Sequence, residues 1–429
     1  MVCRLILNSY QKCILRGEGK VWLKPNLDID RELCASWIMS LMQDLEKILD
    51  TVLPIDPSFR RIEPAMIDRC MYDTRRYALE GSKEAFLFSA MRLLALPDNG
   101  HTRLIPNDSI SVLPLRFVSI GTAVQLTDTA LETTVPRGEL IAVNGTPLSQ
   151  IEAAAGKFLA GTRQRKRVIG PILLAWPYAL AHLGFSSKES STEYRLKGEN
   201  GQITDLKVEN RLTVPASMLY PRNEHGKADP AWKPRTFVEI EDRQEFGLSI
   251  LLPSFFDPSE SALPKAISAA AEHVRTCGNN KFLIDVRGNT GGDFLQTMPL
   301  IDAISENAGR QVVVLVDKFT FSAAIVFVAI LKHRLGRRLK LVGEETGDGL
   351  TFFAEGGLLD LPTSGAVVRY SSAFHDWENG TSDETTPAEI AQQMVPAGKL
   401  HLDLEWIEGP AAEVSQEAFH QRVLNALCD

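Results

Sequence analysis

The chain has 429 residues, of which 44% are hydrophobic and 23% charged, and its formal net charge is −8. This composition predicts about two to four globular domains with a sizeable core, and it excludes extended disorder. The most basic segment is "RQRKRVIG" at 163–170. Nucleic-acid binding usually needs a broader basic footprint, so we interpret this run as a solvated face and expect no nucleic-acid partner.

The cysteines and the apolar runs exclude two further classes. No apolar run reaches about 18 residues, so no membrane span is predicted. The N-terminal sequence has neither the long apolar core nor the small-residue cleavage site of a secretory signal, which favours a cytoplasmic protein. The six cysteines have no paired spacing, so we expect isolated thiols and neither a disulfide framework nor a zinc site. They are Cys3, Cys13, Cys34, Cys70, Cys277 and Cys428.

Residues 30 to 97 are predicted to form three helices. The first carries Leu33, Trp37, Leu41, Leu45 and Leu49 on one stripe at helical spacing. The second runs from Met66 to Leu79. The third starts at the capping residue Ser82 and ends before Pro97.

A β-rich region follows. Residues 110 to 165 are predicted to form short strands, an Asn-Gly turn and a helix after it. The breaker-rich stretch at 221–235 indicates a surface loop or linker.

From residue 237 strands and helices alternate. Apolar strands within 246–256, at 282–286, at 311–317 and at 339–343 are separated by helical segments. Continuous β-branched strands with helical connections predict a mostly parallel sheet with right-handed crossovers. The helix from Ala323 to Leu331 is apolar on every face, so we expect it to be buried on all sides.

Two loops follow the carboxyl ends of these strands, where ligands bind to parallel sheets. They are "RGNTGGD" and "DKFTFSAA", and the second carries Ser322 at a helix start. Ser322 is either a nucleophile or a helix cap. If it is a nucleophile, the amide of Ala323 forms half of an oxyanion hole, and Gly291 or Gly292 supplies the other half by close approach of its backbone. Otherwise the glycines serve only a tight turn.

A serine nucleophile needs a base, and histidine is the usual one. Among the eight histidines, His101 follows a helix end directly, in "DNGHTRL". The others lie on predicted helices or in less defined segments. The residues alone do not establish that His101 meets the serine.

Five blocks in order resemble the tail-specific (C-terminal-processing) serine peptidases, and most closely the branch that includes the tricorn core protease. The blocks are "LPDNGHTRL", "LIAVNGTPLSQI", "FLIDVRGNTGGD", "VVVLVDKFTFSAAIVFVAIL" and "LKLVGEETGDG". The resemblance implies a crotonase-like (ClpP-like) parallel-sheet catalytic domain, an N-terminal helical bundle and a metal-free, cofactor-free serine mechanism on peptide or protein substrates.

The resemblance also implies roles for individual residues. Ser322 matches the family's nucleophile, His101 its histidine, and Gly291 or Gly292 its oxyanion glycine. A second branch uses a Ser-Lys dyad, but Asp348 stands where that lysine would be. A carboxylate there cannot take the serine proton as a lowered-pKa amine does, which favours His101.

The acid of the Ser-His-Glu branch lies roughly 60 residues beyond its serine. By this resemblance Glu384 is the first candidate, Glu378 the second, and Glu344 an alternative in the "VGEETG" turn. Pro387 is followed by Ala388 where the family has aspartate.

Three domains are expected: 1–105 as the helical bundle with the histidine loop, 106–235 as a β-rich, PDZ-like region, and 236–429 as the catalytic domain. The predicted function is a serine peptidase. The alternatives are an inactive binding protein of the same fold and an acyl-thioester hydrolase or isomerase.

Overall fold

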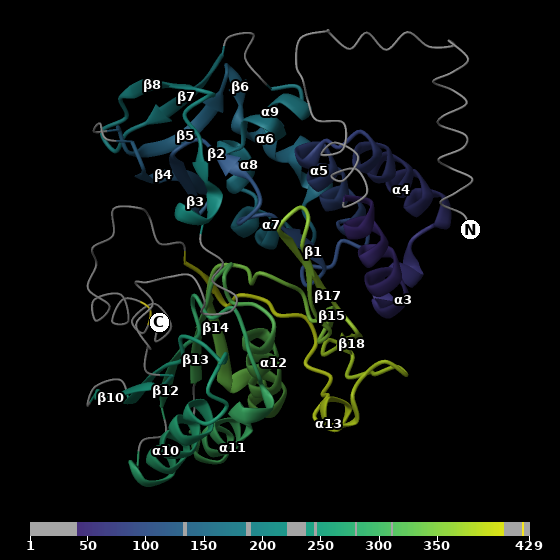
Figure 1. Ribbon diagram of the computed structural model, residues 1–429. Coiled ribbons are helices and arrows are strands. Elements are labelled where there is room, and N and C mark those ends of the chain that lie inside the picture. Colours follow the sequence, from purple (N-terminus) through teal and green to yellow (C-terminus); the bar gives the residue numbers. More distant parts are fainter. Residues whose placement is uncertain are drawn as a thin grey trace, which may run out of the picture.

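The protein is described by a computed structural model (Figure 1). The described residues are 41–131, 135–185, 190–220, 237–243, 247–278, 281–309, 312–406 and 423. Residues 30–40 of the first predicted helical segment and the predicted 221–235 loop lie outside them. In the described part, no helix is long and apolar enough to cross a membrane.

Helices form the N-terminal part, as the apolar spacing predicts. Helical backbone runs from residue 41, through a π-helical stretch at Ile48–Val52, to α3 (Leu53–Ile55). It is followed by α4 (Pro64–Leu79) and α5 (Lys83–Leu94). Most side chains of α5 are buried, so this helix lies inside the first hydrophobic core.

An antiparallel sheet with the order β3-β4-β5-β7-β8 follows, and β6 pairs with β5. Strand β3 alternates buried and half-buried residues, as expected of a sheet with one face on the core. The strands are β3 (Leu115–Ile120), β4 (Ala123–Thr129), β5 (Gly138–Val143), β6 (Thr146–Pro147), β7 (Ser191–Lys197) and β8 (Ile203–Glu209), with the short pair β2 (Ser111–Val112) and β9 (Val214–Pro215) beside them. The helices of this region are α6 (Leu148–Ala155), α7 (Arg163–Ile169), α8 (Ile172–Ala175) and α9 (Pro177–His182).

The predicted parallel sheet is present. Its order is β10-β11-β12-β13-β14-β19, and all neighbours pair in parallel except β10 with β11. The strands are β10 (Glu239–Arg243), β11 (Gly247–Leu251), β12 (Phe282–Asp285), β13 (Val312–Val316), β14 (Leu339–Gly343) and β19 (Leu404–Glu405). The crossover helices are α10 (Ala262–Thr276), α11 (Met298–Asn307) and α12 (Ala323–Leu335).

The two faces of this sheet are covered differently. Alternate residues such as Ile284 and Val314 pack in one core with α10, α11 and α12, which lie together in Figure 1. The other face, including Leu315, packs against Val423 and the strand β19. Ten residues of α12 are buried, which confirms that this helix is enclosed.

Strands that are distant in sequence pair with each other between the two cores. Strand β1, two residues after His101, pairs with β17, and Figure 1 shows both strands between α3 and α12. Since β17 belongs to the first core, a segment distant in sequence completes the N-terminal part. The remaining elements are β1 (Arg103–Ile105), β15 (Thr351–Ala354), β16 (Gly357–Leu361), β17 (Ala366–Tyr370), β18 (Ala373–Asp376) and α13 (Ala388–Ala391). The architecture is mixed α/β with several sheets.

Candidate active site

Ser322 has a backbone conformation that helix capping does not require. Its φ is 56° and its ψ is −128°, at the residue preceding α12. A positive φ costs energy in any residue other than glycine, and such strain is concentrated at functional sites. The Ser322 side chain makes no capping hydrogen bond to the helix. Capping therefore does not explain the serine at this position.

Hydrogen bonds fix the loop of Ser322 to the loop after β12. The Phe321 amide donates to the Asn289 carbonyl oxygen at 3.0 Å. Asp317 accepts bonds from the amides of Gly288 and Thr320. The two loops at the carboxyl edge of the sheet thus form one unit.

The glycines after β12 differ in how closely other atoms approach them. A Cβ on Gly291 would lie 2.7 Å from the Ser322 Cβ and 3.1 Å from the Ala323 nitrogen, so this glycine allows close approach to the serine. A Cβ on Gly292 would lie 1.9 Å from the carbonyl carbon of Phe255. Gly288 has a φ of 74° but meets nothing within 4 Å, so it serves only the turn.

The amide groups beside Ser322 are not equivalent. The Gly291 N–H donates to Oδ1 of Asn289 at 2.9 Å. In the part of the chain that the structure describes, the N–H groups of Gly292 and Ala323 have no hydrogen-bond acceptor. These two amides are therefore the ones available to an oxyanion.

His101 lies beside the serine loop and is 1% exposed. Its ring stacks on Phe321, the neighbour of Ser322, at a centroid distance of 4.3 Å, and on Phe352 at 5.2 Å. Its Nδ1 lies 3.6 Å from Oδ2 of Asp348, too far for a hydrogen bond. Both ring nitrogens lack a hydrogen-bond partner, so no His101–Ser322 bond is formed. Catalytic hydrogen bonds are often long before substrate binds.

Burial sets the charge of the histidine and of its acidic neighbour. It holds the pKa of His101 well below the usual range, and the positive charges of Arg369 and Arg165 lower that pKa further. Burial also raises the pKa of Asp348 to about 7, although Arg165 and the Gly349 amide act in the opposite direction. At neutral pH the imidazole is therefore in its basic form, and Asp348 is close to its midpoint.

The structure pairs the expected glutamates with other groups. The Glu384 side chain is 75% exposed, and its Oε1 lies 2.7 Å from Nη1 of Arg60. Glu344 pairs instead with Lys318 at 3.3 Å. For Glu378, the described contact is made by the backbone carbonyl, which accepts from Gly398. None of the three glutamates pairs with His101 among the described ion pairs.

Asp348, which is not among the expected acids, is the carboxylate that lies beside His101. It lies in the turn after β14, at the carboxyl edge where both predicted site loops lie. The rule that ligands bind at this edge points to Asp348 as well, whereas the family pattern concerns this position only as the place of a lysine. Lys340, before the turn, pairs with Asp403 at 2.9 Å.

The basic run at 163–170 is not simply a solvated face. Arg165 is 4% exposed, and its guanidinium lies 4.0 Å from the centre of the Phe321 ring. Thr162 Oγ1 donates to the carbonyl oxygen of Gly347, next to Asp348. The start of α7 thus contacts the serine loop and the aspartate turn.

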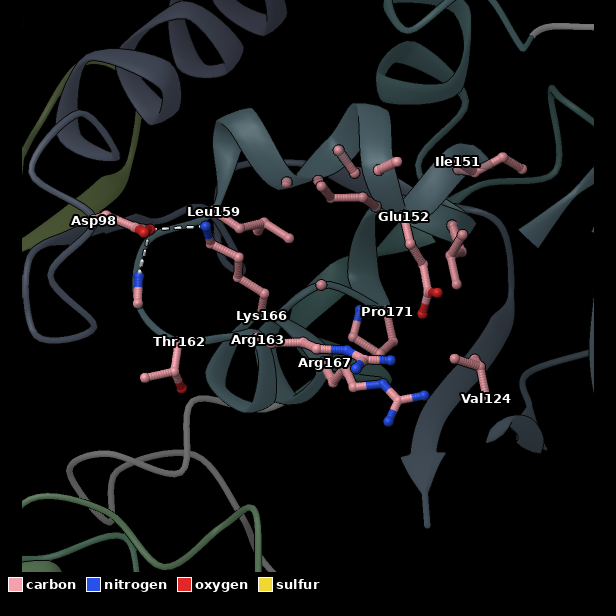
Figure 2. Close-up of a pocket in the computed structure, with 17 residues that line it drawn as sticks. Asp98, Val124, Ile151, Glu152, Leu159, Thr162, Arg163, Lys166, Arg167 and Pro171 are labelled. Carbon is pink, nitrogen blue, oxygen red and sulfur yellow. Dashed lines mark hydrogen bonds and ion pairs between the residues drawn. The ribbon is translucent and has the colours of Figure 1, made fainter. Parts of the chain in front are cut away.

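The same segment reaches the histidine loop. Lys166 Nζ lies 2.7 Å from Oδ1 of Asp98, and the Gly161 amide donates to the same oxygen, as Figure 2 shows. These residues line a cavity of about 380 Å³ with an apolar interior that includes Ile151 and Leu173. Segment 161–166 therefore contacts the serine loop, the aspartate turn and the histidine loop.

Comparison with solved structures gives the following similarities. Mature CPAF matches 92% of this chain and 97% of that chain with a TM-score of 0.52 and 11% sequence identity. The chain is similar to CPAF in fold. The photosystem II D1 C-terminal processing protease matches 87% of this chain and 93% of that chain (TM-score 0.38, 15% identity). The tricorn protease matches 92% of this chain and 37% of that chain (TM-score 0.35, 12% identity).

No family model matches the sequence, and no curated protein matches it. The resemblance to tail-specific serine peptidases is confirmed at the level of the fold. At 11% identity the similarity to CPAF assigns no residue of this chain a role.

Proposed function

We propose that the protein is a serine peptidase that hydrolyses peptide bonds of peptide or protein substrates. Ser322 Oγ attacks the carbonyl carbon while His101 accepts the serine proton. The carbonyl oxygen becomes negative and accepts hydrogen bonds from the Gly292 and Ala323 amides. The proton then passes from His101 to the leaving amine, and water hydrolyses the acyl-enzyme by the same steps.

The conformation of Ser322 carries this proposal. A serine with φ of 56° that makes no capping bond, at the start of a buried helix, has the arrangement of a nucleophile on a strained strand-to-helix turn. The close approach of Gly291 to the Ser322 Cβ supports the same reading, since any larger residue would collide with the serine.

The His101–Asp348 pair supplies the base. A histidine held in its neutral form can accept the serine proton, and an ionised Asp348 stabilises the imidazolium that results. The separation of 3.6 Å between Nδ1 and Oδ2 is small enough to close to a hydrogen bond with a slight movement when substrate binds. We therefore assign the role of the third residue to Asp348 in place of Glu384.

We also propose a division of the chain into three domains. We assign residues 236–429 to a crotonase-like catalytic domain, 106–235 to a PDZ-like region and 1–105 to a helical bundle that carries His101. The parallel order of β11 to β14 supports the first assignment. The pairing of β1 with β17 indicates that the bundle and the catalytic domain share a sheet.

Peptide hydrolysis by the wild type and by Ser322→Ala tests this function. A mixture of peptides and a panel of acyl thioesters are offered to both proteins. Cleavage of peptides that is lost in the folded variant supports the proposal. Serine-dependent turnover of thioesters alone favours the acyl-thioester alternative, and no turnover of either favours a binding protein.

A further inference from the structure

A buried group of hydrogen-bonded polar side chains includes the residues around His101. Two members belong to the loop of the histidine, one precedes the 3₁₀ helix Pro57–Arg61, and one follows β17. None of the four is more than 6% exposed. They are Asn99, Thr102, Asp56 and Ser371. Three segments that are distant in sequence therefore contribute to one polar network, which we call the buried network.

Hydrogen bonds close the turn that carries His101. The Thr102 amide donates to the Asn99 carbonyl oxygen at 2.9 Å, and Nδ2 of Asn99 donates to Thr102 Oγ1 at 2.9 Å. The same Nδ2 donates to Ser371 Oγ at 2.9 Å. Oδ1 of Asn99 accepts from the Phe353 amide at 3.3 Å, which fixes the direction of the side-chain amide. The turn is thus closed by its own backbone and attached to β15 and to the residue after β17.

Asp56 accepts the other donors of the network. Thr102 Oγ1 donates to Oδ2 at 2.6 Å, and the Ser371 amide donates to the same oxygen at 2.9 Å. Oδ1 accepts from the amide and the hydroxyl of Ser58. Four donors is the number that an ionised carboxylate accommodates. Capping of the 3₁₀ helix accounts for the bonds to Oδ1, but it does not explain why Oδ2 bonds to the histidine turn.

The buried network also holds a ring on which His101 stacks. Ser371 Oγ donates to the Phe353 carbonyl oxygen at 3.1 Å, so both backbone groups of Phe353 are bonded to the network. The residue before it, Phe352, stacks on the imidazole. Because neither ring nitrogen of His101 makes a hydrogen bond, the turn and the stacked rings are what orient the imidazole.

We propose that Asp56, acting through Thr102 and Ser371, is a positioning residue for His101. The proposal rests on the peptidase function and adds residues that set the place of the base without touching the substrate. A displacement of about 1 Å at a reacting group lowers a rate by about 100-fold, so a buried network that fixes the histidine turn contributes directly to the rate. The N-terminal helical part thereby takes part in the site.

Thr102→Val tests the network, because it removes the hydroxyl that joins Asn99 to Asp56 and keeps the shape of the side chain. We expect kcat on one peptide to fall about 10- to 100-fold with little change in KM, since the imidazole moves while the substrate contacts remain. Thr102→Ser keeps the hydroxyl and should retain most of the rate. Steady-state kinetics compare the two variants with the wild type.

Thr74→Val is the matched control. Thr74 is as buried as Thr102, and its hydroxyl donates to the Cys70 carbonyl oxygen at 2.8 Å within α4. This variant also loses a buried hydroxyl, but it leaves the network intact and should keep the wild-type kcat. An equal fall of kcat in Thr74→Val would mean that lost stability lowers the rate, which would overturn the proposal.

Reaction with diethyl pyrocarbonate measures the position of His101 without turnover. In the wild type His101 is 1% exposed and should be protected, whereas the exposed His273 and His333 should react. In Thr102→Val we expect His101 to react about 10-fold faster, as for the loss of one hydrogen bond from a locally opening loop. The buried His375 should stay protected, which distinguishes local opening from unfolding. Mass spectrometry of the digested protein measures each site.

The two measurements separate this proposal from the peptidase function. If the wild type hydrolyses peptides, an unchanged kcat in Thr102→Val overturns the positioning role. If it hydrolyses none, the peptidase function fails, and faster modification of His101 alone in Thr102→Val still supports the network. Unchanged modification, or equal modification of His375, would then overturn it. Should Thr102→Val not fold, Ser371→Ala, which removes the bond to the Phe353 carbonyl, is judged by the same two measurements.

Discussion

Oδ2 of Asp348 lies 3.6 Å from Nδ1 of His101, and both side chains are buried. The carboxylate expected from the family pattern, Glu384, pairs with Arg60 at the surface. A buried aspartate beside a neutral histidine is the arrangement that can stabilise an imidazolium during catalysis. Asp348 therefore becomes the first residue to test.

Asp348→Asn should lower kcat about 10²–10⁴-fold with little change in KM, because the amide cannot stabilise the imidazolium. Glu384→Gln is the control and should retain nearly full activity, since an exposed ion pair contributes little. Steady-state kinetics on one peptide compare the two. A large loss in Glu384→Gln together with none in Asp348→Asn would restore the original assignment.

The pH dependence of activity should follow the ionisation of the Asp348 carboxyl group. Its pKa is raised to about 7, so the carboxylate forms as pH rises through that value. The pKa of His101 is lowered, so this residue is already a base there. We expect kcat/KM to rise through about pH 7, and Asp348→Asn to lack this rise. An identical profile for both proteins would exclude Asp348 as the titrating group.

The contribution of Asp348 to the free energy of unfolding should change with pH in the direction opposite to that of the activity. An unfolded aspartate loses its proton at about pH 4, whereas folded Asp348 keeps it until about pH 7. Across that interval the folded state binds the extra proton, so the Asp348 contribution lowers the free energy of unfolding as pH rises. Relative to that of the wild type, the free energy of unfolding of Asp348→Asn should therefore increase by roughly 1.4 kcal/mol for each pH unit between about pH 4 and pH 7.

Urea unfolding of both proteins at several pH values measures this difference. The contribution of His101 is common to both proteins and largely cancels in it. A difference in free energy of unfolding that does not change with pH would show that Asp348 titrates normally.

Substitution of two glycines by alanine tests whether the close approach of neighbouring backbone atoms requires glycine. Gly292→Ala should destabilise the protein by several kcal/mol, because its Cβ would lie 1.9 Å from the Phe255 carbonyl carbon at a φ of 135°. Gly288→Ala is matched in loop and in positive φ but has open space, so its cost should be about 1–2 kcal/mol. Thermal unfolding compares the two. Equal losses would mean that only the backbone dihedral, and not the approach to Phe255, requires glycine.

The sequence predicts the parallel sheet and both site loops, since buried β-branched strands and glycine turns are local patterns. It also predicts that His101 follows a helix end. It does not predict that this loop meets Phe321, because the contact depends on how β1 pairs with β17, more than 260 residues later.

Two residues show why the rest of the site was missed. Arg165 belongs to a run whose composition indicates a solvated face, whereas its side chain is buried with the guanidinium over the Phe321 ring. Asp348 is a turn residue whose raised pKa is caused by burial, which a local pattern does not reveal. Glu384 was selected by its distance along the chain, whereas the path of the loop after β18 decides where its side chain lies.

Covalent labelling of Ser322 with a fluorophosphonate tests the central claim most directly. We expect one modified residue in the wild type, identified as Ser322 by mass spectrometry of the digested protein. Labelling should be slow in His101→Ala, in which the base is lost, and absent in Ser322→Ala. A wild-type protein that is folded but not labelled at Ser322, or that is labelled equally fast in His101→Ala, would contradict the serine mechanism.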